Sequence, residues 1–160
     1  MSTELIINAD SKKMAIALLE DGRLMEYQTQ DAQNEFSVGD IYIGRVRKVL
    51  PGLNSAFVEI GHEKDAFLHY NDLGPQVKSL LKYIRRTQSG GQKTAMLDEF
   101  KLESNIDKNG HMADVMPSGT PVLVQITKEA ISTKGPRLTS EISIPGRMLV
   151  LVPFNDKVAI

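Results

Sequence analysis

The stretch LNSAFVEIGHEKDAFLHYNDL, residues 53–73, indicates the fold more clearly than any other part of the chain. Read as two strands joined by a turn, it alternates between apolar and polar positions, so each strand turns one face toward a core. The predicted core positions are Ala56, Val58, Ile60, Ala66 and Leu68. The opposite face carries Ser55, Phe57, Glu59, Asp65, Phe67 and His69. Full burial of a Phe stabilises a protein by roughly 1.5–3 kcal/mol, so two Phe residues on a polar face need an explanation.

Two explanations for Phe57 and Phe67 follow from the residues alone. The rings stack with nucleobases, at roughly 1–3 kcal/mol per base, or they pack against another segment or a protein partner. The alternation of apolar and polar residues does not decide between these two explanations. Cations in the same block favour nucleobases, because Lys and Arg beside aromatic rings hold backbone phosphates while bases stack. The candidate contact residues are therefore Phe57, Phe67, His69, Arg45, Arg47, Lys48, Lys128, Lys134 and Arg137.

The composition is that of an ordinary globular protein, with 41% hydrophobic and 24% charged residues among 160. Its 19 basic and 20 acidic residues give a net charge of −1, which says nothing about nucleic acid as a partner. No Cys is present, which excludes disulfides and cysteine metal sites. Neither the His residues nor the carboxylates show catalytic or metal spacing, so no catalytic residue or metal ligand is predicted. The chain has neither a long apolar run nor a secretory signal, which excludes a membrane span and favours the cytoplasm.

The first segment predicts three short strands, ELIIN, MAIALLE and RLMEY. Asp21-Gly22 between the second and third is a strong hairpin signal, because a primed turn needs positive φ at its centre. These strands are apolar on both faces, so we expect them to belong to a larger sheet and to expose apolar surface on their own. The polar run QTQDAQNEFS, residues 28–37, reads as a linker.

The rest of the chain predicts a small five-stranded Greek-key barrel. Its strands are DIYIGRVRKVL, the two strands of residues 53–73, TPVLVQITKE and PRLTSEISI. A long insertion, residues 74–117, interrupts them and is expected to be functional or mobile rather than structural. Within it Val77, Leu80, Leu81 and Ile84 follow helical spacing and predict a short amphipathic helix. RMLVLVPF, residues 147–154, is predicted to be a buried strand.

These motifs together resemble a known RNA-binding module, the OB-fold S-one domain. GRVRKVLPGLNSAFVEIG and DAFLHYNDL contain its Gly-x-Val, Ala-Phe-Val and Phe-Leu-His elements and its acidic-Leu close. With the flanks IINAD…MAIALLEDGRLMEY and VLVQITKE…TKGPRLTSEISIPGRMLVLVP, the whole order is similar to the N-terminal part of the ribonuclease E/G family. The resemblance covers nearly all of the chain outside residues 74–111.

The resemblance implies a domain organisation and an activity. Residues 1–36 would be the first strands of an RNase H-like domain, residues 37–144 an S-one domain with the insertion, and residues 145–160 the start of a 5′-end-sensing region. The full enzyme would be a magnesium-dependent, homo-oligomeric endoribonuclease that cuts single-stranded RNA in rRNA maturation and mRNA decay. Its magnesium-binding aspartates come later in the family order, so this chain alone is expected to be inactive.

The resemblance also assigns individual residues. Phe57, Phe67 and Lys134 match RNA-contacting positions of the family, and Lys128 matches a basic position nearby. Gly146 and Val150 match positions that help form a pocket for a 5′-monophosphate, whose Arg-Thr pair comes later in the family order. Two other functions stay open: a free-standing RNA-binding or translation-associated module without nuclease activity, and a protein-interaction domain.

Overall fold

The computed structural model describes residues 2–9, 13–31, 36–93, 97 and 100–155. The chain folds as two compact units, Met1–Glu35 and Phe36–Ile160, and each is described here by itself. No described helix is long and apolar enough to cross a membrane.

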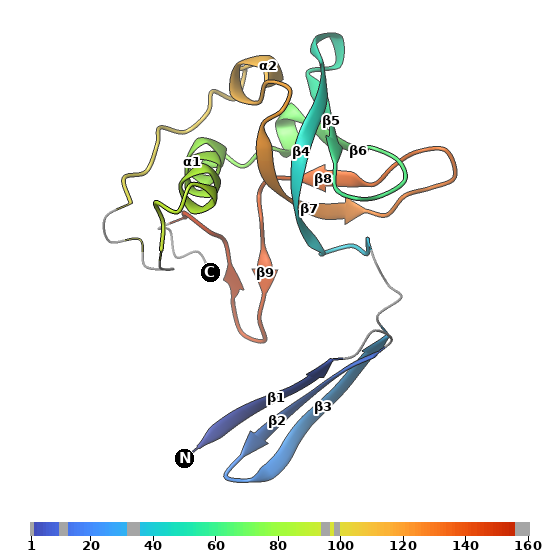
Figure 1. Ribbon diagram of the computed structural model, residues 1–160, viewed down its shortest axis with the longest axis vertical. Coiled ribbons are helices and arrows are strands. Elements are labelled where there is room, and N and C mark those ends of the chain that lie inside the picture. Colours follow the sequence, from blue (N-terminus) through green and yellow to red (C-terminus); the bar gives the residue numbers. More distant parts are fainter. Residues whose placement is uncertain (1, 10–12, 32–35, 94–96, 98–99, 156–160) are drawn as a thin grey trace. The chain divides into compact units, whose positions relative to one another are not determined.

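The first unit is an antiparallel sheet of three strands, β1 (Thr3–Ala9), β2 (Lys13–Glu20) and β3 (Arg23–Asp31), in that order (Figure 1). The predicted hairpin is confirmed: Asp21 and Gly22 have φ values of 47° and 75°, as a primed turn requires. The predicted linker begins too early, because Gln28–Asp31 pair with the start of β2. Their polarity misled the prediction, since a ladder needs only backbone groups and the sheet has solvent on its faces.

Several large apolar side chains of the first unit are exposed. They are Leu5, Ile6, Ile7, Leu24, Met25 and Tyr27, each at least half exposed. This is the exposure that the two-sided apolar pattern predicts. The apolar surface is therefore available to a further element or chain.

The second unit contains a closed barrel of five strands, β4 (Ile41–Leu50), β5 (Ser55–Glu59), β6 (Ala66–His69), β8 (Arg137–Thr139) and β7 (Pro121–Lys128). Around the barrel the order is β4-β5-β6-β8-β7, and β7 pairs with β4 to close it. Strands β6 and β8 pair in parallel, while the other four pairs are antiparallel. This is the five-stranded Greek-key barrel of the OB-fold, and the predicted fold class is confirmed.

The barrel interior is filled by the predicted alternating positions. Ala56, Val58, Ile60, Ala66 and Leu68 are all buried, with partners from the other strands such as Val46 and Leu138. Ser55 differs from the prediction, because it is buried rather than on the polar face. Its hydroxyl donates to the Leu53 carbonyl at 2.7 Å, which satisfies the buried group.

The insertion forms two helices, α1 (Val77–Gln88) and α2 (Met112–Val115). The predicted helix is confirmed, since Val77, Leu80, Leu81 and Ile84 are its buried apolar positions. The insertion is also structural, contrary to expectation. Val77 and Leu81 join the barrel core, as do the fully buried Met112 and Met116, which the sequence pattern did not mark. Short 3-10 turns, Pro51–Leu53 and Tyr70–Asp72, follow β4 and β6.

The end of the chain differs from its predicted form. Strand β8 stops at Thr139, and Ile142 packs instead against Leu80 and Ile84 of α1. Residues 147–154 are not a buried strand: β10 is only Val150–Leu151, paired with β9 (Ile144–Pro145), and Met148 is 88% exposed. A run of apolar residues gives no buried strand here because the described chain supplies no layer to cover it.

Candidate functional site

One residue from each barrel strand lies in a continuous row on the outer surface. Lys48 of β4 is opposite Phe57 of β5, and Phe57 is opposite Phe67 of β6. Phe67 is in turn opposite Arg137 of β8, which is opposite Lys128 of β7. Residues directly opposite one another across a ladder present their side chains to the same face. We call Lys48, Phe57, Phe67, Arg137 and Lys128 the basic–aromatic row.

Two β-bulges put both lysines into this row. Simple alternation from the buried Val46 and Ile126 would turn Lys48 and Lys128 toward the core. The register instead shifts between Val46 and Lys48, and again between Ile126 and Lys128. Each shift adds one residue to a strand, so the lysine that follows it points outward. The bulges therefore place a cation at each end of the row.

The two rings of the row touch each other and remain partly open to solvent. Phe57 and Phe67 have ring centroids 6.2 Å apart at an interplanar angle of 68°, an edge-to-face pair. Both side chains are half-buried, whereas their neighbours Ala56, Val58 and Leu68 are completely buried. The rings are thus fixed by contact with each other and still offer accessible aromatic surface.

The cations of the row differ in their partners. Arg137 donates from Nε and Nη2 to Asp72 Oδ2, at 3.1 and 2.9 Å, and its side chain remains 46% exposed. This pairing orients the guanidinium beside Phe67. Lys48 and Lys128 are exposed and form no ion pair with any described residue. Two cations of the row are therefore available to an anion.

Lys134 lies in a loop that is held beside β6. The turn closes with reciprocal backbone hydrogen bonds between Ile131 and Lys134, at 3.1 and 2.9 Å. At its base Phe67 N donates to Pro136 O at 2.8 Å. Gly135 lies so close to the Asp65 carbonyl that a Cβ would collide with it. The loop that carries the exposed Lys134 is therefore held beside β6, the strand of Phe67, and the predicted RNA contact of Lys134 stays a prediction.

Three other predicted contact residues lie outside the row. Arg45 donates to the Gly119 carbonyl at 3.0 Å, and Arg47, the bulge residue, lies 3.4 Å from both Glu59 and Asp65. His69 is two residues from Phe67, and its Nδ1 accepts from Asn71 N at 3.1 Å. These contacts engage Arg45, Arg47 and one nitrogen of His69 in the fold.

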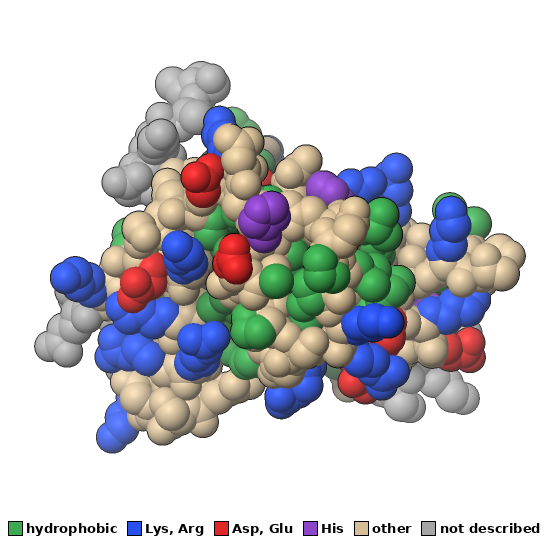
Figure 2. Space-filling view, turned by 90° about the horizontal axis from the view of Figure 1, so that it is seen from above, with side chains coloured by type: hydrophobic (Ala, Val, Ile, Leu, Met, Phe, Trp, Pro, Cys, Tyr) green, Lys and Arg blue, Asp and Glu red, His purple; other side chains and the backbone are tan. Residues whose placement is uncertain are grey.

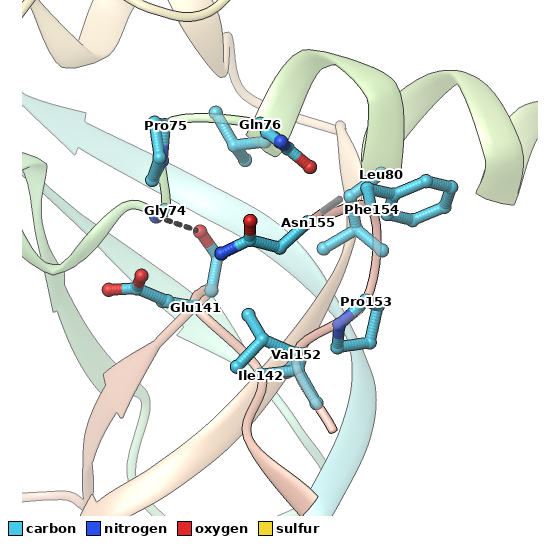
Figure 3. A pocket seen from close by; sticks show the side chains of 12 residues that line it. Gly74, Pro75, Gln76, Leu80, Glu141, Ile142, Val152, Pro153, Phe154 and Asn155 are labelled. Atoms are coloured by element: carbon cyan, nitrogen blue, oxygen red, sulfur yellow. Dashed lines mark hydrogen bonds between the residues drawn. The ribbon is translucent and has the colours of Figure 1, made fainter. Parts of the chain in front are cut away.

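A separate pocket lies between the start of α1 and two later segments, residues 140–142 and 152–155 (Figure 3). Gly74 N donates to Ser140 Oγ at 3.3 Å, drawn as the dashed line, and Gln76 Oε1 is buried without a partner among the described residues. The pocket lining includes Glu141 but no Lys, Arg or His, so it does not attract anions.

Gly146 and Val150 do not line this pocket but lie in the exposed β9–β10 hairpin. Their predicted role in a 5′-monophosphate pocket stays a prediction.

Known proteins resemble the chain over nearly its whole length. It is 36% identical over 159 residues to ribonuclease G of Haemophilus influenzae, covering 99% of this chain and 28% of that protein. It is 31% identical over 160 residues to ribonuclease G of Escherichia coli K12, covering 100% and 29%. It is 35% identical over 151 residues to ribonuclease E of Nostoc, covering 94% and 18%. No family model matches the chain.

The chain belongs to the ribonuclease E/G family. The resemblance predicted from the barrel motifs and their flanks is thereby confirmed. The aligned residues include the first sheet, the barrel and the insertion, so the likeness to the ribonuclease E/G family is not confined to one domain. The chain spans less than a third of the length of these relatives.

Proposed function

We propose that this chain is the RNA-binding segment of an endoribonuclease of the E/G type, and that it holds single-stranded RNA on the basic–aromatic row. The observation that carries the proposal is the row itself, with two partly exposed rings between cations. The family membership supports RNA rather than another polyanion as the ligand.

The arrangement divides the binding work between rings and charges. Bases stack on the accessible surfaces of Phe57 and Phe67, which requires bases that are free of a duplex partner. Lys48 at one end, and Lys128 with Arg137 at the other, contact the phosphates on either side. Stacking and phosphate contacts read no base edges, so the row accepts many sequences. Lys134 extends the basic end, and the free nitrogen of His69 is a further contact.

For the whole protein we propose a magnesium-dependent ribonuclease that acts in the cytoplasm, as a homo-oligomer, in rRNA maturation and mRNA decay. The described residues include no group of three His, Asp or Glu side chains that could hold a metal ion. Within this described part of the chain no residues fit a magnesium site, and we assign these residues no step of the hydrolysis. Their share of the reaction is to bind and orient the substrate.

The proposal is tested by titrating labelled single-stranded RNA of about 10 nucleotides, within the site size of an OB-fold. The double variant Phe57→Ala/Phe67→Ala should weaken binding by roughly 1–3 kcal/mol for each stacked base. Tyr27→Ala, which removes an exposed ring from the first unit, is the matched control. Circular dichroism establishes that each variant is folded. Equal affinity of parent and double variant would show that the row is not the binding surface.

The salt dependence separates the charges from the rings. Lys128→Gln/Lys134→Gln should lower the slope of log affinity against log salt by about 0.7 for each lost phosphate contact. The aromatic double variant should leave that slope unchanged. An unaltered slope in the lysine variant would remove both residues from the proposed surface.

A further inference from the structure

The insertion helix carries a stripe of cations that the basic–aromatic row does not use. Lys78, Lys82, Arg85 and Arg86 line one side of a groove. The rest of its lining is Leu81, Glu103, Asp114 and Val115. In Figure 2 many Lys and Arg side chains gather at the left, the side on which α1 lies in Figure 1. We call this groove the α1 groove.

Arg85 and Arg86 lie in the last turn of α1, where cations suit the negative end of the helix dipole, but the earlier cations of the stripe have no such reason within the helix. The spacings of Lys78–Lys82, Lys82–Arg85 and Lys82–Arg86 bring like charges together at three or four residues, which destabilises a helix. The first turn of α1 has no acidic residue, and Lys78 stands there against the positive end of the helix dipole. A bound anion would relieve both repulsions.

Two of the four cations are engaged within the fold. Lys82 Nζ donates to Glu103 Oε1 at 2.7 Å and to the Lys101 carbonyl at 2.8 Å. The Lys82 hydrogen bond lowers the pKa of Glu103, and the charges of Lys82, Lys101 and Lys78 lower it further. The Arg86 guanidinium lies 5.7 Å from the centre of the Phe100 ring. These contacts fix the wall of the groove.

The other two cations are available. Lys78 and Arg85 are exposed, and neither forms a hydrogen bond or an ion pair through its side chain with any described residue. Arg85 is seven positions after Lys78 in α1, a rise of about 10 Å along the helix axis at 1.5 Å per residue. A pair of charges at that spacing suits an extended polyanion better than a single small anion.

We propose that the α1 groove binds phosphates of the same RNA strand that the basic–aromatic row holds, so that the strand runs beyond the row. This inference rests on the proposed function. The groove and the row belong to one compact unit, and α1 packs against Leu123 of β7, five positions before Lys128. The groove lining contains only two apolar residues and no aromatic ring, so it contacts the backbone and not the bases.

The test compares short and long single-stranded RNA on the 160-residue chain. An oligonucleotide of about 6 nucleotides covers the row alone, and one of about 20 exceeds the upper site size of one OB-fold. Lys78→Gln/Arg85→Gln removes the free charges and keeps good helix formers. Arg23→Gln/Lys108→Gln removes the same charge outside the α1 groove and is the control. Affinity is measured between about 50 and 200 mM salt.

We expect Lys78→Gln/Arg85→Gln to lower the affinity for the long oligonucleotide by about tenfold. The slope of log affinity against log salt should fall by about 1.4, for two lost phosphate contacts. The short oligonucleotide should bind this variant as tightly as it binds the control variant.

Equal losses of affinity at both RNA lengths would overturn the inference in favour of a general electrostatic effect, and no loss at either length would overturn it outright. Loss of affinity for an acidic peptide but not for RNA would assign the groove to a protein partner instead. If Phe57→Ala/Phe67→Ala also leaves both oligonucleotides unaffected, it is the proposed function that fails.

Discussion

Gly135 is the residue on which the position of Lys134 depends. A Cβ at this position would collide with the Asp65 carbonyl, a backbone atom that cannot rotate away. The loop after β7 therefore approaches the β5–β6 turn only because residue 135 has no side chain. This close approach holds the loop that carries Lys134 beside β6, the strand of Phe67.

Gly135→Ala should therefore lower the free energy of unfolding by about 1–3 kcal/mol and weaken RNA binding through displacement of Lys134. Gly52→Ala is the matched control, because an added Cβ there meets nothing within 4 Å and the backbone φ is not positive. Urea unfolding and RNA titration of both variants provide the measurement. A Gly135→Ala protein as stable as the control would mean that the loop does not make this contact.

Tyr70 makes the free energy of unfolding depend on pH in the alkaline range. Burial, followed by the charges of Asp107 and Asp114, raises the pKa of its hydroxyl. The hydroxyl donates to the Asp107 carbonyl at 2.5 Å, a bond that ionisation would remove. The unfolded chain loses this proton first, so the stabilisation is present below pH of about 10 and is lost as pH rises through the higher folded pKa.

We therefore expect Tyr70→Phe to flatten the fall in unfolding free energy above pH of about 10, relative to the parent. Tyr27→Phe, at an exposed ring, is the control. Urea unfolding at neutral and alkaline pH measures both. Parallel profiles for the parent and Tyr70→Phe would contradict the assignment.

Residue-level prediction from the sequence succeeded where alternation sufficed. Strand parity placed Phe57 and Phe67 together on the outer face, and the structure has them in contact there. It could not place Lys48 or Lys128, because a bulge reverses parity and no residue type marks it in advance. Strand parity also could not predict which side chains form ion pairs. Only the fold shows that Arg47 lies between Glu59 and Asp65.

At the scale of elements, the bulge of β7 turns Lys128 outward because it accommodates the extra residue Thr127. Thr127 is the extra residue, and its hydroxyl donates to the Arg137 carbonyl at 3.2 Å. Without Thr127, Lys128 would directly follow the buried Ile126, so regular alternation would also point it outward, still opposite Arg137. We therefore expect a Thr127 deletion to keep Lys128 in the row, to leave RNA affinity within about twofold, and to cost about 1 kcal/mol of stability through the lost Thr127 hydrogen bond.

Thr127→Ser, which keeps the bulge and the hydroxyl, is the control and should change stability by less than about 0.5 kcal/mol. Urea unfolding midpoints and RNA titrations of the deletion variant and of Thr127→Ser provide the measurement. A deletion variant that loses several kcal/mol of stability or most of its RNA affinity would show that the bulge itself is needed to orient Lys128.

The same scale shows where sequence patterns decide an element and where they do not. Helical spacing found α1 because one stripe of that helix packs on the barrel. The apolar run of residues 147–154 did not give a buried strand, because burial depends on a second layer that a local pattern does not specify. Met112 and Met116 enter the core from a single short turn of helix, too brief for any periodicity to appear.

At the scale of the whole molecule, the two units differ in how well they cover their apolar residues. The barrel encloses its core, whereas β1 and β3 leave Leu5, Ile7 and Leu24 more than half exposed. The first sheet is therefore the surface on which association with a further element or with a second chain is expected. The RNA surface that we propose lies entirely on the barrel unit.

A fragment of residues 36–160 should accordingly fold and bind single-stranded RNA within about twofold of the 160-residue chain, while binding less of a hydrophobic dye. Circular dichroism, dye fluorescence and RNA titration compare the two proteins. A folded fragment with strongly reduced RNA affinity would place part of the binding surface on residues 1–35.

The contact between unpaired bases and the two row rings is tested most directly by nuclear magnetic resonance of isotope-labelled Phe rings during titration with single-stranded RNA. The chain has five Phe residues, which makes the spectrum simple to assign. With RNA of about 6 nucleotides, which covers the row alone, we expect the ring signals of Phe57 and Phe67 to shift upfield and saturate together, while those of Phe100 and Phe154, which contact each other, stay in place. Saturable RNA binding with the Phe57 and Phe67 signals unmoved would contradict the account.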